Sequence, residues 1–283
     1  MESWHRNRLS AEQAGFVEHR FPGVRLLRDL SWNLVDTAVL EVEHGGCRYV
    51  VKAAGPANHH IGREIDAHES FAGIWASTDR APSLVTANRS LNLLVTEYLD
   101  GSLVQGGAAE YAPDTYLQAG QLLRVFHAQA VRVDPRYEEA ATAKSMAWLD
   151  KPHRIEEAAA NKARCILAAY RPEPVEAVPT HGDWQPRNWL MSGTELRIID
   201  FGRFEFRPSI SDFCRLAAQQ WRSGPELEDA FFEGYGSDPR EGRLWNITML
   251  REAVSTAAWA FQIGDPEFEE QGHRMLRNAL AHY

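Results

Sequence analysis

The chain has 283 residues, of which 44% are hydrophobic and 24% are charged, and its formal net charge is −9. This length and composition are typical of a globular protein with a sizeable core in one large or two smaller domains. The acidic balance argues against nucleic acid or an anionic membrane as a partner, because phosphate groups attract Lys and Arg. The sequence shows neither an apolar signal region nor a membrane-spanning run, and its three cysteines form no Cys-x-x-Cys pair. We therefore expect a reduced, cytoplasmic protein.

The first hundred residues have mainly a β pattern. Short apolar runs predict strands at 24–27, 37–42 and 47–53, and His44-Gly45-Gly46 predicts a hairpin turn between the last two. Two further strands are predicted within 82–99, with 91–99 the clearest. Apolar residues at helical spacing predict a helix over 58–75.

Lys52 lies inside the apolar third strand, where a solvated charge is unexpected. Such a lysine can neutralise a ligand phosphate with its compact charge, or it can be a surface residue of an edge strand. Glu64, beside the apolar face of the following helix, is the predicted partner of Lys52. Glu69 is the alternative, and either acid can instead be a solvated surface charge.

After Asp100-Gly101 the pattern becomes helical. Helices are predicted at 114–130, at 144–170 with a break at Pro152, and from 226 to the end with breaks at 234–239 and 264–266. His127, at the end of the first of these helices, is expected to be a core residue. The change from β to α content predicts an α+β protein with a lobe at 1–99 and a second lobe at 100–283.

Two motifs in the second lobe contain its most reactive groups. His181-Gly182-Asp183 precedes a predicted hairpin of strands 188–191 and 196–199, and Asp200-Phe201-Gly202 follows it. The hairpin would bring Asn188 close to Asp200, with Asp183 in the loop before them. Hard oxygen ligands of this kind suit Mg²⁺. Asp183 would then remain to orient and deprotonate an attacking hydroxyl.

These motifs resemble the catalytic core of the aminoglycoside phosphotransferase family, a branch of the protein-kinase-like fold. The resemblance implies two lobes, a small antiparallel β lobe and a larger, mostly helical one. It implies that Asp183 accepts the hydroxyl proton and that Asn188 and Asp200 hold magnesium. Lys52 would neutralise the α- and β-phosphates of ATP or GTP.

The same resemblance assigns supporting roles. Glu97 and Leu99 fall where adenine hydrogen-bonds to the backbone between the lobes, and Thr96 would face the back of the nucleotide pocket. Asn33 lies in the glycine-free loop 31–36 and is either a phosphate-side contact or part of a plain hairpin loop. Two further residues would support the catalytic loop, His181 and Asp212, although Asp212 can also be an acid at a helix start, where Ser209 or Ser211 would cap the helix.

The acceptor is expected to be a cationic, hydroxylated small molecule, such as an aminoglycoside or a basic cyclic-peptide antibiotic. The C-terminal helices are rich in acids, with the densest group at Asp265, Glu267, Glu269 and Glu270, which either line the substrate site or form a solvated surface. Arg187 either contacts the phosphate or the substrate, or is a solvated loop charge. The alternatives are a metabolic kinase for choline, an amino sugar or a similar alcohol, and a catalytically silent kinase-like module. We expect a monomer or homodimer.

Overall fold

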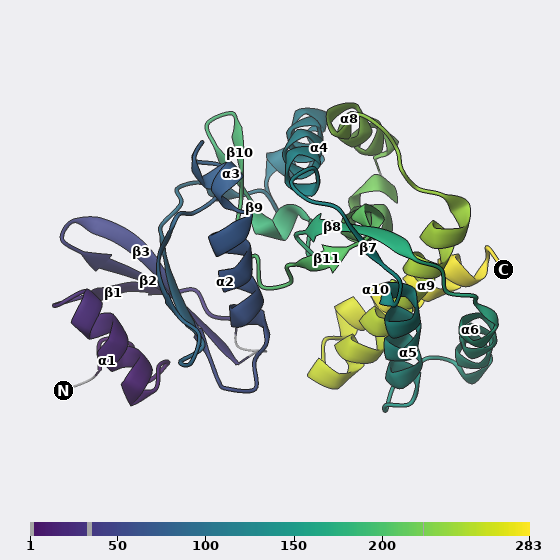
Figure 1. Cartoon of the computed structure of the whole chain (residues 1–283), viewed down its shortest axis with the longest axis horizontal. Coiled ribbons are helices and arrows are strands. Elements are labelled where there is room, and N and C mark those ends of the chain that lie inside the picture. The colour runs from purple at the N-terminus through teal and green to yellow at the C-terminus, as the bar shows by residue number, and fades with distance from the viewer. Residues whose placement is uncertain (1–2, 33–35, 223) are drawn as a thin grey trace.

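The computed structural model describes residues 3–32, 36–222 and 224–283. A β-rich N-terminal lobe and a larger helical lobe lie side by side (Figure 1). The predicted α+β, two-lobed architecture is therefore confirmed. Asn33, the predicted phosphate-side contact, falls outside the described residues. No helix in the described ranges is long and apolar enough to cross a membrane.

The N-terminal lobe contains a five-stranded antiparallel sheet. Its strand order is β1 (Arg25–Asp29), β2 (Thr37–His44), β3 (Cys47–Ala54), β5 (Leu93–Glu97) and β4 (Leu84–Asn88). The predicted strands and the turn at Gly45-Gly46 are confirmed. Side chains alternate between the two faces of the sheet, so that Val51 packs under one helix while Lys52 points to the other side.

Helix α1 (Ala11–Arg20) covers one face of this sheet and was not predicted. Its only strong sequence signal is the capping box, in which Ser10 and Gln13 satisfy each other's backbone amides. Val17 of α1 packs against Leu40 and Val51 of the sheet.

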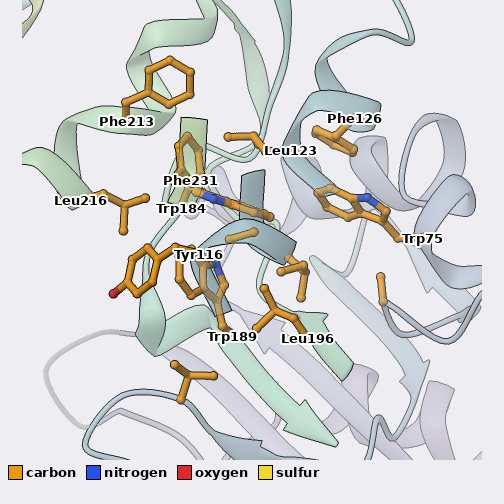
Figure 2. Close-up of a cluster of buried hydrophobic side chains, with 14 of the residues drawn as sticks. Trp75, Tyr116, Leu123, Phe126, Trp184, Trp189, Leu196, Phe213, Leu216 and Phe231 are labelled. Carbon is orange, nitrogen blue, oxygen red and sulfur yellow. The ribbon is translucent and has the colours of Figure 1, made fainter. Parts of the chain in front are cut away.

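The predicted helix 58–75 is two helices, α2 (His60–Ser70) and α3 (Gly73–Ala76), because the chain leaves the helical conformation at Phe71. This break directs Trp75 into the larger lobe, where its ring stacks on Phe126 with 4.4 Å between the ring centroids. Figure 2 shows this pair beside Trp184 and Trp189 of the catalytic region. The inner end of the N-terminal lobe and the larger lobe thus share one aromatic core.

The larger lobe is built on two packed helix groups. In one group, α4 (Pro113–His127) crosses α8 (Pro225–Tyr235) closely, since a Cβ on Gly120 would lie 2.1 Å from the Phe231 carbonyl oxygen. The other group contains four helices, α5 (Tyr137–Leu149), α6 (Glu157–Ala169), α9 (Gly242–Ile263) and α10 (Pro266–Leu280). The predicted helix 144–170 is α5 and α6, and α5 begins seven residues earlier, at Tyr137.

Two small antiparallel sheets hold the segments that contain the two predicted motifs. One has the order β10 (Glu195–Ile198), β9 (Trp189–Ser192) and β6 (Ser102–Leu103), which confirms the predicted hairpin. The other has the order β11 (Glu205–Arg207), β8 (Val175–Thr180) and β7 (Arg132–Asp134), and it was not predicted. Strands β7 and β11 have three residues each and are too short to show a clear alternation, so their pairing with β8 decides them.

Short helical turns complete the chain. They are the 3₁₀ turns Ala108–Tyr111, Pro186–Asn188, Ser209–Phe213 and Gln220–Arg222, and helix α7 (Cys214–Ala218). The predicted cap by Ser209 or Ser211 is wrong, because no side chain caps the turn and the Ser211 hydroxyl donates back to the Pro208 carbonyl.

Candidate active site

The catalytic loop begins where β8 ends, at His181 and Gly182. Gly182 has φ = +80°, and a Cβ there would lie 2.2 Å from the Arg203 carbonyl oxygen. Any side chain would therefore be strained and would collide with backbone. The His181 ring bonds to the Ile199 carbonyl at 3.1 Å, which joins this loop to the strand that leads to Asp200.

Asp212 fixes the backbone of the same loop. Its carboxylate accepts the amide hydrogens of His181 at 2.9 Å and Gly182 at 2.6 Å. His127 bonds to the Asp212 carboxylate at 3.0 Å, and its other ring nitrogen bonds to Tyr235 Oη. Burial by itself would raise the pKa of Asp212, but the bonds from His127 and Gly182 hold it below the ordinary value. His127 is buried as expected, and it also orients this support.

Asp183 is only 3% exposed and is surrounded by donors. Its Oδ1 meets Gln185 Nε2 at 2.6 Å and Arg215 Nε at 2.7 Å, while Oδ2 meets Arg187 Nη2 at 2.5 Å and Asn188 Nδ2 at 3.0 Å. Burial by itself would raise the pKa of Asp183, but Arg215 and Arg187 hold it well below its ordinary value. The carboxylate is therefore ionised throughout the neutral range.

Sequence reasoning did not identify Gln185 or Arg215 as neighbours of Asp183. Gln185 could have been found, because it is two residues from Asp183 in the chain. Arg215 lies on α7 and carries no local signal, so only the folding of α7 against the catalytic loop brings it to Asp183.

Asn188 and Asp200 meet at the base of the β9–β10 hairpin. The Ile199 amide donates to the Asn188 carbonyl at 3.0 Å, which places Asn188 beside Asp200. Asn188 Nδ2 also donates to the Asp183 carbonyl at 2.8 Å, so Oδ1 is the side-chain atom left for a cation. Asp200 has φ = +67°, an uncommon backbone conformation for a residue other than glycine, and its side chain is 49% exposed.

Lys52 connects the two lobes through ion pairs. Its ammonium lies 2.7 Å from Glu64 Oε1 and 3.2 Å from Asp200 Oδ1. Burial by itself would lower the pKa of Lys52, but Asp200 and Glu64 hold it above its ordinary value. Of the two predicted partners, Glu64 makes this contact, whereas Glu69 pairs with Arg89 on the surface at 2.6 Å.

The predicted nucleotide-side residues lie at the end of β5. Thr96 is buried between Val50 of β3 and Leu84 of β4. Glu97 is exposed, and its amide is bonded to the Ser83 carbonyl at 2.9 Å. The amide of Leu99 donates to no backbone carbonyl in the part of the chain that the structure describes.

A cavity of about 320 Å³ adjoins the catalytic loop between α5 and α9. Its cationic lining comes from both lobes and comprises Arg63, Lys144, Arg203, Arg207, Arg215 and Arg251. Glu252 is the one acid among its described lining residues, and Trp148 and Trp259 provide flat walls. Other tryptophans of this lobe are buried, since Trp189 and Trp221 are core residues.

The predicted acidic substrate cluster lies at the start of α10. Asp265 caps this helix by accepting the Phe268 amide at 3.0 Å, and Glu267 lies in its first turn. Glu269 is buried in an ion pair with Arg154, and Glu270 pairs with Arg277 at 2.9 Å. These contacts give the acids structural roles, because carboxylates stabilise a helix N-terminus. Within 265–270, the residue that lines the cavity is Phe268.

The side chains of Lys52, Glu64, Asp183, Asn188 and Asp200 follow one another in the order of the kinase template and lie between a β lobe and a helical lobe. This arrangement defines a phosphotransferase of the protein-kinase-like class. Residues 35–245 match the sequence model of the phosphotransferase enzyme family that contains the aminoglycoside phosphotransferases. The chain belongs to this family, which confirms the resemblance stated above. It is a phosphotransferase enzyme that acts on a hydroxyl group of a small molecule.

Solved structures share the fold over almost the whole chain. Spectinomycin phosphotransferase APH(9)-Ia, in complex with ADP and spectinomycin, is 12% identical with a TM-score of 0.65, covering 97% of this chain and 98% of its own. A thermostable variant of the aminoglycoside phosphotransferase APH(4)-Ia, in complex with ADP and hygromycin B, is 15% identical with a TM-score of 0.69, covering 95% and 97%. Choline kinase LicA from Streptococcus pneumoniae is 14% identical with a TM-score of 0.67, covering 95% and 99%. No curated protein sequence matches the chain.

Proposed function

We propose that this enzyme transfers the γ-phosphate of ATP or GTP to a hydroxyl of a small molecule, with magnesium as cofactor. The observation that carries the proposal is the single cluster formed by Lys52, Glu64 and Asp200 beside Asp183 and Asn188. A catalytically silent module would be expected to lack at least one of these groups.

The donor set fits magnesium. Asn188 Oδ1 and the half-exposed Asp200 carboxylate are hard oxygen ligands, and the described residues contain no group of three or more His, Cys, Asp or Glu that could hold a metal by themselves. Magnesium commonly binds through one or two protein groups, with phosphates and waters completing its coordination. When bound, it would neutralise charge on the transferred phosphoryl group.

The nucleotide would lie between the lobes, with Lys52 at its phosphates. Asp200 is already paired with Lys52, so a bound phosphate would share this lysine with it. The free amide of Leu99 and the backbone of Glu97 suit the adenine edge, and Thr96 is the buried side chain behind them. Two of the structural neighbours are complexes with ADP, which supports a nucleotide on this side.

Asp183 would orient the acceptor hydroxyl and take its proton. Phosphoryl transfer passes through a loose transition state, so the depressed pKa of Asp183 is compatible with this role. All the favoured acceptor directions of its carboxylate are occupied by donors, so an incoming hydroxyl has to replace one of them. Arg187 is the most exposed of these donors, since 38% of its side chain is exposed. It is therefore the donor that we expect to move.

The charge of the acceptor is the finer question. Spectinomycin and hygromycin B complexes among the neighbours support an antibiotic kinase, and the choline kinase supports a metabolic one. The basic lining of the cavity weighs against a polycationic acceptor, and it also weighs against a cationic metabolic alcohol such as choline or an amino sugar. A resistance role, a cytoplasmic location and a monomeric or homodimeric state stay predictions.

The test is phosphorylation of a panel of small alcohols by purified enzyme with MgATP or MgGTP, followed by ADP or GDP release and by product mass. The matched control is Asp200→Asn, which should lower turnover and raise the magnesium concentration needed for half-maximal rate. If wild-type enzyme binds no magnesium nucleotide and phosphorylates nothing in the panel, the proposal is wrong. A magnesium titration of Asp200→Asn that superimposes on wild type would remove the metal assignment alone.

A further inference from the structure

The charges around the cavity are only partly compensated. Arg215 is paired with both Asp183 at 2.7 Å and Glu252 at 3.2 Å. Glu252, the one acid of the described lining, and the Asp183 carboxylate are therefore both already paired with an arginine. Asp183 is in addition shared with Arg187, so this group has no spare negative charge.

Two more cations of the lining compete for one carboxylate. Arg207 lies 2.8 Å from Glu205, and Arg63 lies 3.7 Å from the same side chain. Arg251 is satisfied separately by the buried Glu138 at 2.7 Å. Each of these acids is therefore already engaged by at least one arginine.

Lys144 and Arg203 remain. Within the described ranges, neither the Lys144 ammonium nor the Arg203 guanidinium forms an ion pair or hydrogen bond. Partial burial and then the positive charge of Arg207 lower the pKa of Lys144, while burial and then Arg215 lower the pKa of Arg203. Glu205 and Glu252 act in the opposite direction on Lys144, and Asp183 and Glu252 do so on Arg203. Each of these acids is, however, already ion-paired with another arginine.

Their positions relate the surplus charge to the chemistry. Arg203 follows the Asp200-Phe201-Gly202 motif directly, and its carbonyl packs against Gly182 of the catalytic loop. Lys144 belongs to α5, which lies beside α9 in the larger lobe (Figure 1). Both side chains line the same cavity, and its volume of about 320 Å³ is at the small end for ligand sites.

We infer that the acceptor is a small hydroxylated anion, a phosphate ester or carboxylate of an alcohol, whose anionic group binds between Arg203 and Lys144. The inference rests on the phosphotransferase function proposed above and names its substrate class. Guanidinium and ammonium groups together suit a planar or tetrahedral oxyanion through charge-assisted hydrogen bonds. The flat walls of Trp148 and Trp259 would enclose the carbon skeleton.

The reaction then balances without a further reactant. The acceptor hydroxyl oxygen forms a bond to the γ-phosphorus of the nucleotide, and the bond from that phosphorus to the β–γ bridging oxygen breaks. The nucleoside diphosphate leaves with the electron pair of that bond. The hydroxyl proton passes to Asp183 and then to solvent.

A first experiment measures anion binding with the nucleotide site filled. Inorganic phosphate and acetate are titrated calorimetrically into enzyme saturated with Mg²⁺ and the non-hydrolysable analogue AMP-PNP. We expect at least one of the two anions to bind with one-to-one stoichiometry. The affinity should fall about tenfold or more in Arg203→Met and in Lys144→Met, as for loss of a charge-assisted hydrogen bond. Arg277→Met, at an exposed pair outside the cavity, is the matched control and should bind like wild type.

A second experiment compares acceptors that differ only in charge. One set is glycerol, glycerate, glycerol 3-phosphate and 2-amino-1,3-propanediol. The other set is glucose, gluconate, glucose 6-phosphate and glucosamine. We expect an anionic member to have the highest kcat/KM in a set that reacts, and Lys144→Glu to reduce that preference at unchanged AMP-PNP affinity. The phosphate and carboxylate members distinguish the two sources of the anion.

The inference is overturned if neither anion binds in the millimolar range, if binding is unchanged in both variants, or if amines or neutral sugars are preferred. Such a result with magnesium nucleotide still bound and transferred would leave the proposed function intact. Absence of both nucleotide binding and transfer would instead remove the proposed function itself. Melting temperatures of the variants with AMP-PNP exclude misfolding as the cause.

Discussion

The proposed nucleotide side and the proposed acceptor side of this enzyme differ in how their charges are paired. On the proposed nucleotide side, the single cation Lys52 is paired with two carboxylates, Glu64 and Asp200, so the group has one surplus negative charge before any ligand binds. On the proposed acceptor side, cations outnumber acids, and neither Lys144 nor Arg203 forms an ion pair or a side-chain hydrogen bond within the described residues. A cation that is already ion-paired can position a magnesium nucleotide, because the metal ion offsets much of the charge of the phosphates. A group of cations without paired acids instead selects a ligand by its negative charge.

Replacing Asp183 by Asn is expected to have the largest effect. The substitution leaves a polar side chain of the same size but removes the charge and the proton acceptor, so kcat should fall about 10²- to 10⁴-fold. AMP-PNP affinity should stay within about twofold, because Asp183 serves the acceptor side. Steady-state kinetics and calorimetry measure the two quantities. Unchanged turnover would remove Asp183 from the catalytic role.

The nucleotide cluster should respond as a unit. Lys52→Met should raise the dissociation constant of MgATP and lower kcat, while Glu64→Gln should have a smaller effect, because Glu64 acts by positioning Lys52. The double variant should lose less than the sum of the single losses, with a coupling of about 0.5–3 kcal/mol. Glu69→Gln is the matched control, since Glu69 pairs with Arg89 instead. Strict additivity would contradict the positioning role of Glu64.

His68 makes the packing of the nucleotide side sensitive to pH. This side chain is buried against the Phe201 ring at 5.0 Å, and burial together with Lys52 lowers its pKa to about 4. In the unfolded state the pKa of His68 is about 6.5, so the unfolded chain binds this proton at a higher pH than the folded protein does. The free energy of unfolding therefore falls as the pH drops from about 6.5 towards 4. At pH 5 the loss from this group is about 2 kcal/mol.

Denaturant unfolding at pH 7.5 and pH 5 tests this expectation. His68→Leu should lose less stability than wild type between the two pH values, whatever its absolute stability. His282→Gln, at an exposed position near the C-terminus, is the control and should follow wild type. An identical pH dependence in His68→Leu would mean that the pKa of His68 is the same in the folded and unfolded states, which contradicts the expected lowering.

The smallest effect is expected from the acids of α10. Glu267→Gln with Glu270→Gln removes two charges from the helix start while leaving the buried Glu269 pair intact. If the basic cavity is the acceptor site, KM for the best acceptor should change less than about twofold, because solvent-exposed charges are largely screened beyond a Debye length. A clear rise in KM for a cationic acceptor, with a steeper salt dependence, would favour the acidic cluster and would reverse the comparison between the two sides.

The elements that were predicted well are those with a strong local signal. The β2–β3 hairpin has two glycines in the left-handed region, and the β9–β10 hairpin joins two apolar runs of the expected length. Strands β7 and β11 carry no such signal, because a three-residue strand shows no periodicity and exists only through its pairing with the longer β8. The capping box of α1 was a local signal that could have been used.

The acceptor side could not be predicted in the same way. Counting acids along the C-terminal helices indicated a cationic substrate, but a charge count does not say which helix face a residue occupies. Asp265 forms a helix cap, and Glu269 forms a buried ion pair. Arg203 and Lys144 line one cavity, although they come from segments far apart in the chain. The sign of the charge in the cavity therefore depends on how distant segments of the chain pack together.

By itself, the sequence determined the family, the two-lobed α+β fold, and the order of Lys52, Asp183, Asn188 and Asp200, because these features rest on residue types at short spacings. Only the tertiary structure decided that Glu64 pairs with Lys52, that Arg215 holds Asp183, and that the cavity beside the loop of Asp183 is basic. The physical reason is that electrostatic energy depends on distance and burial in three dimensions. Helix packing sets both quantities through contacts between residues that the sequence keeps far apart.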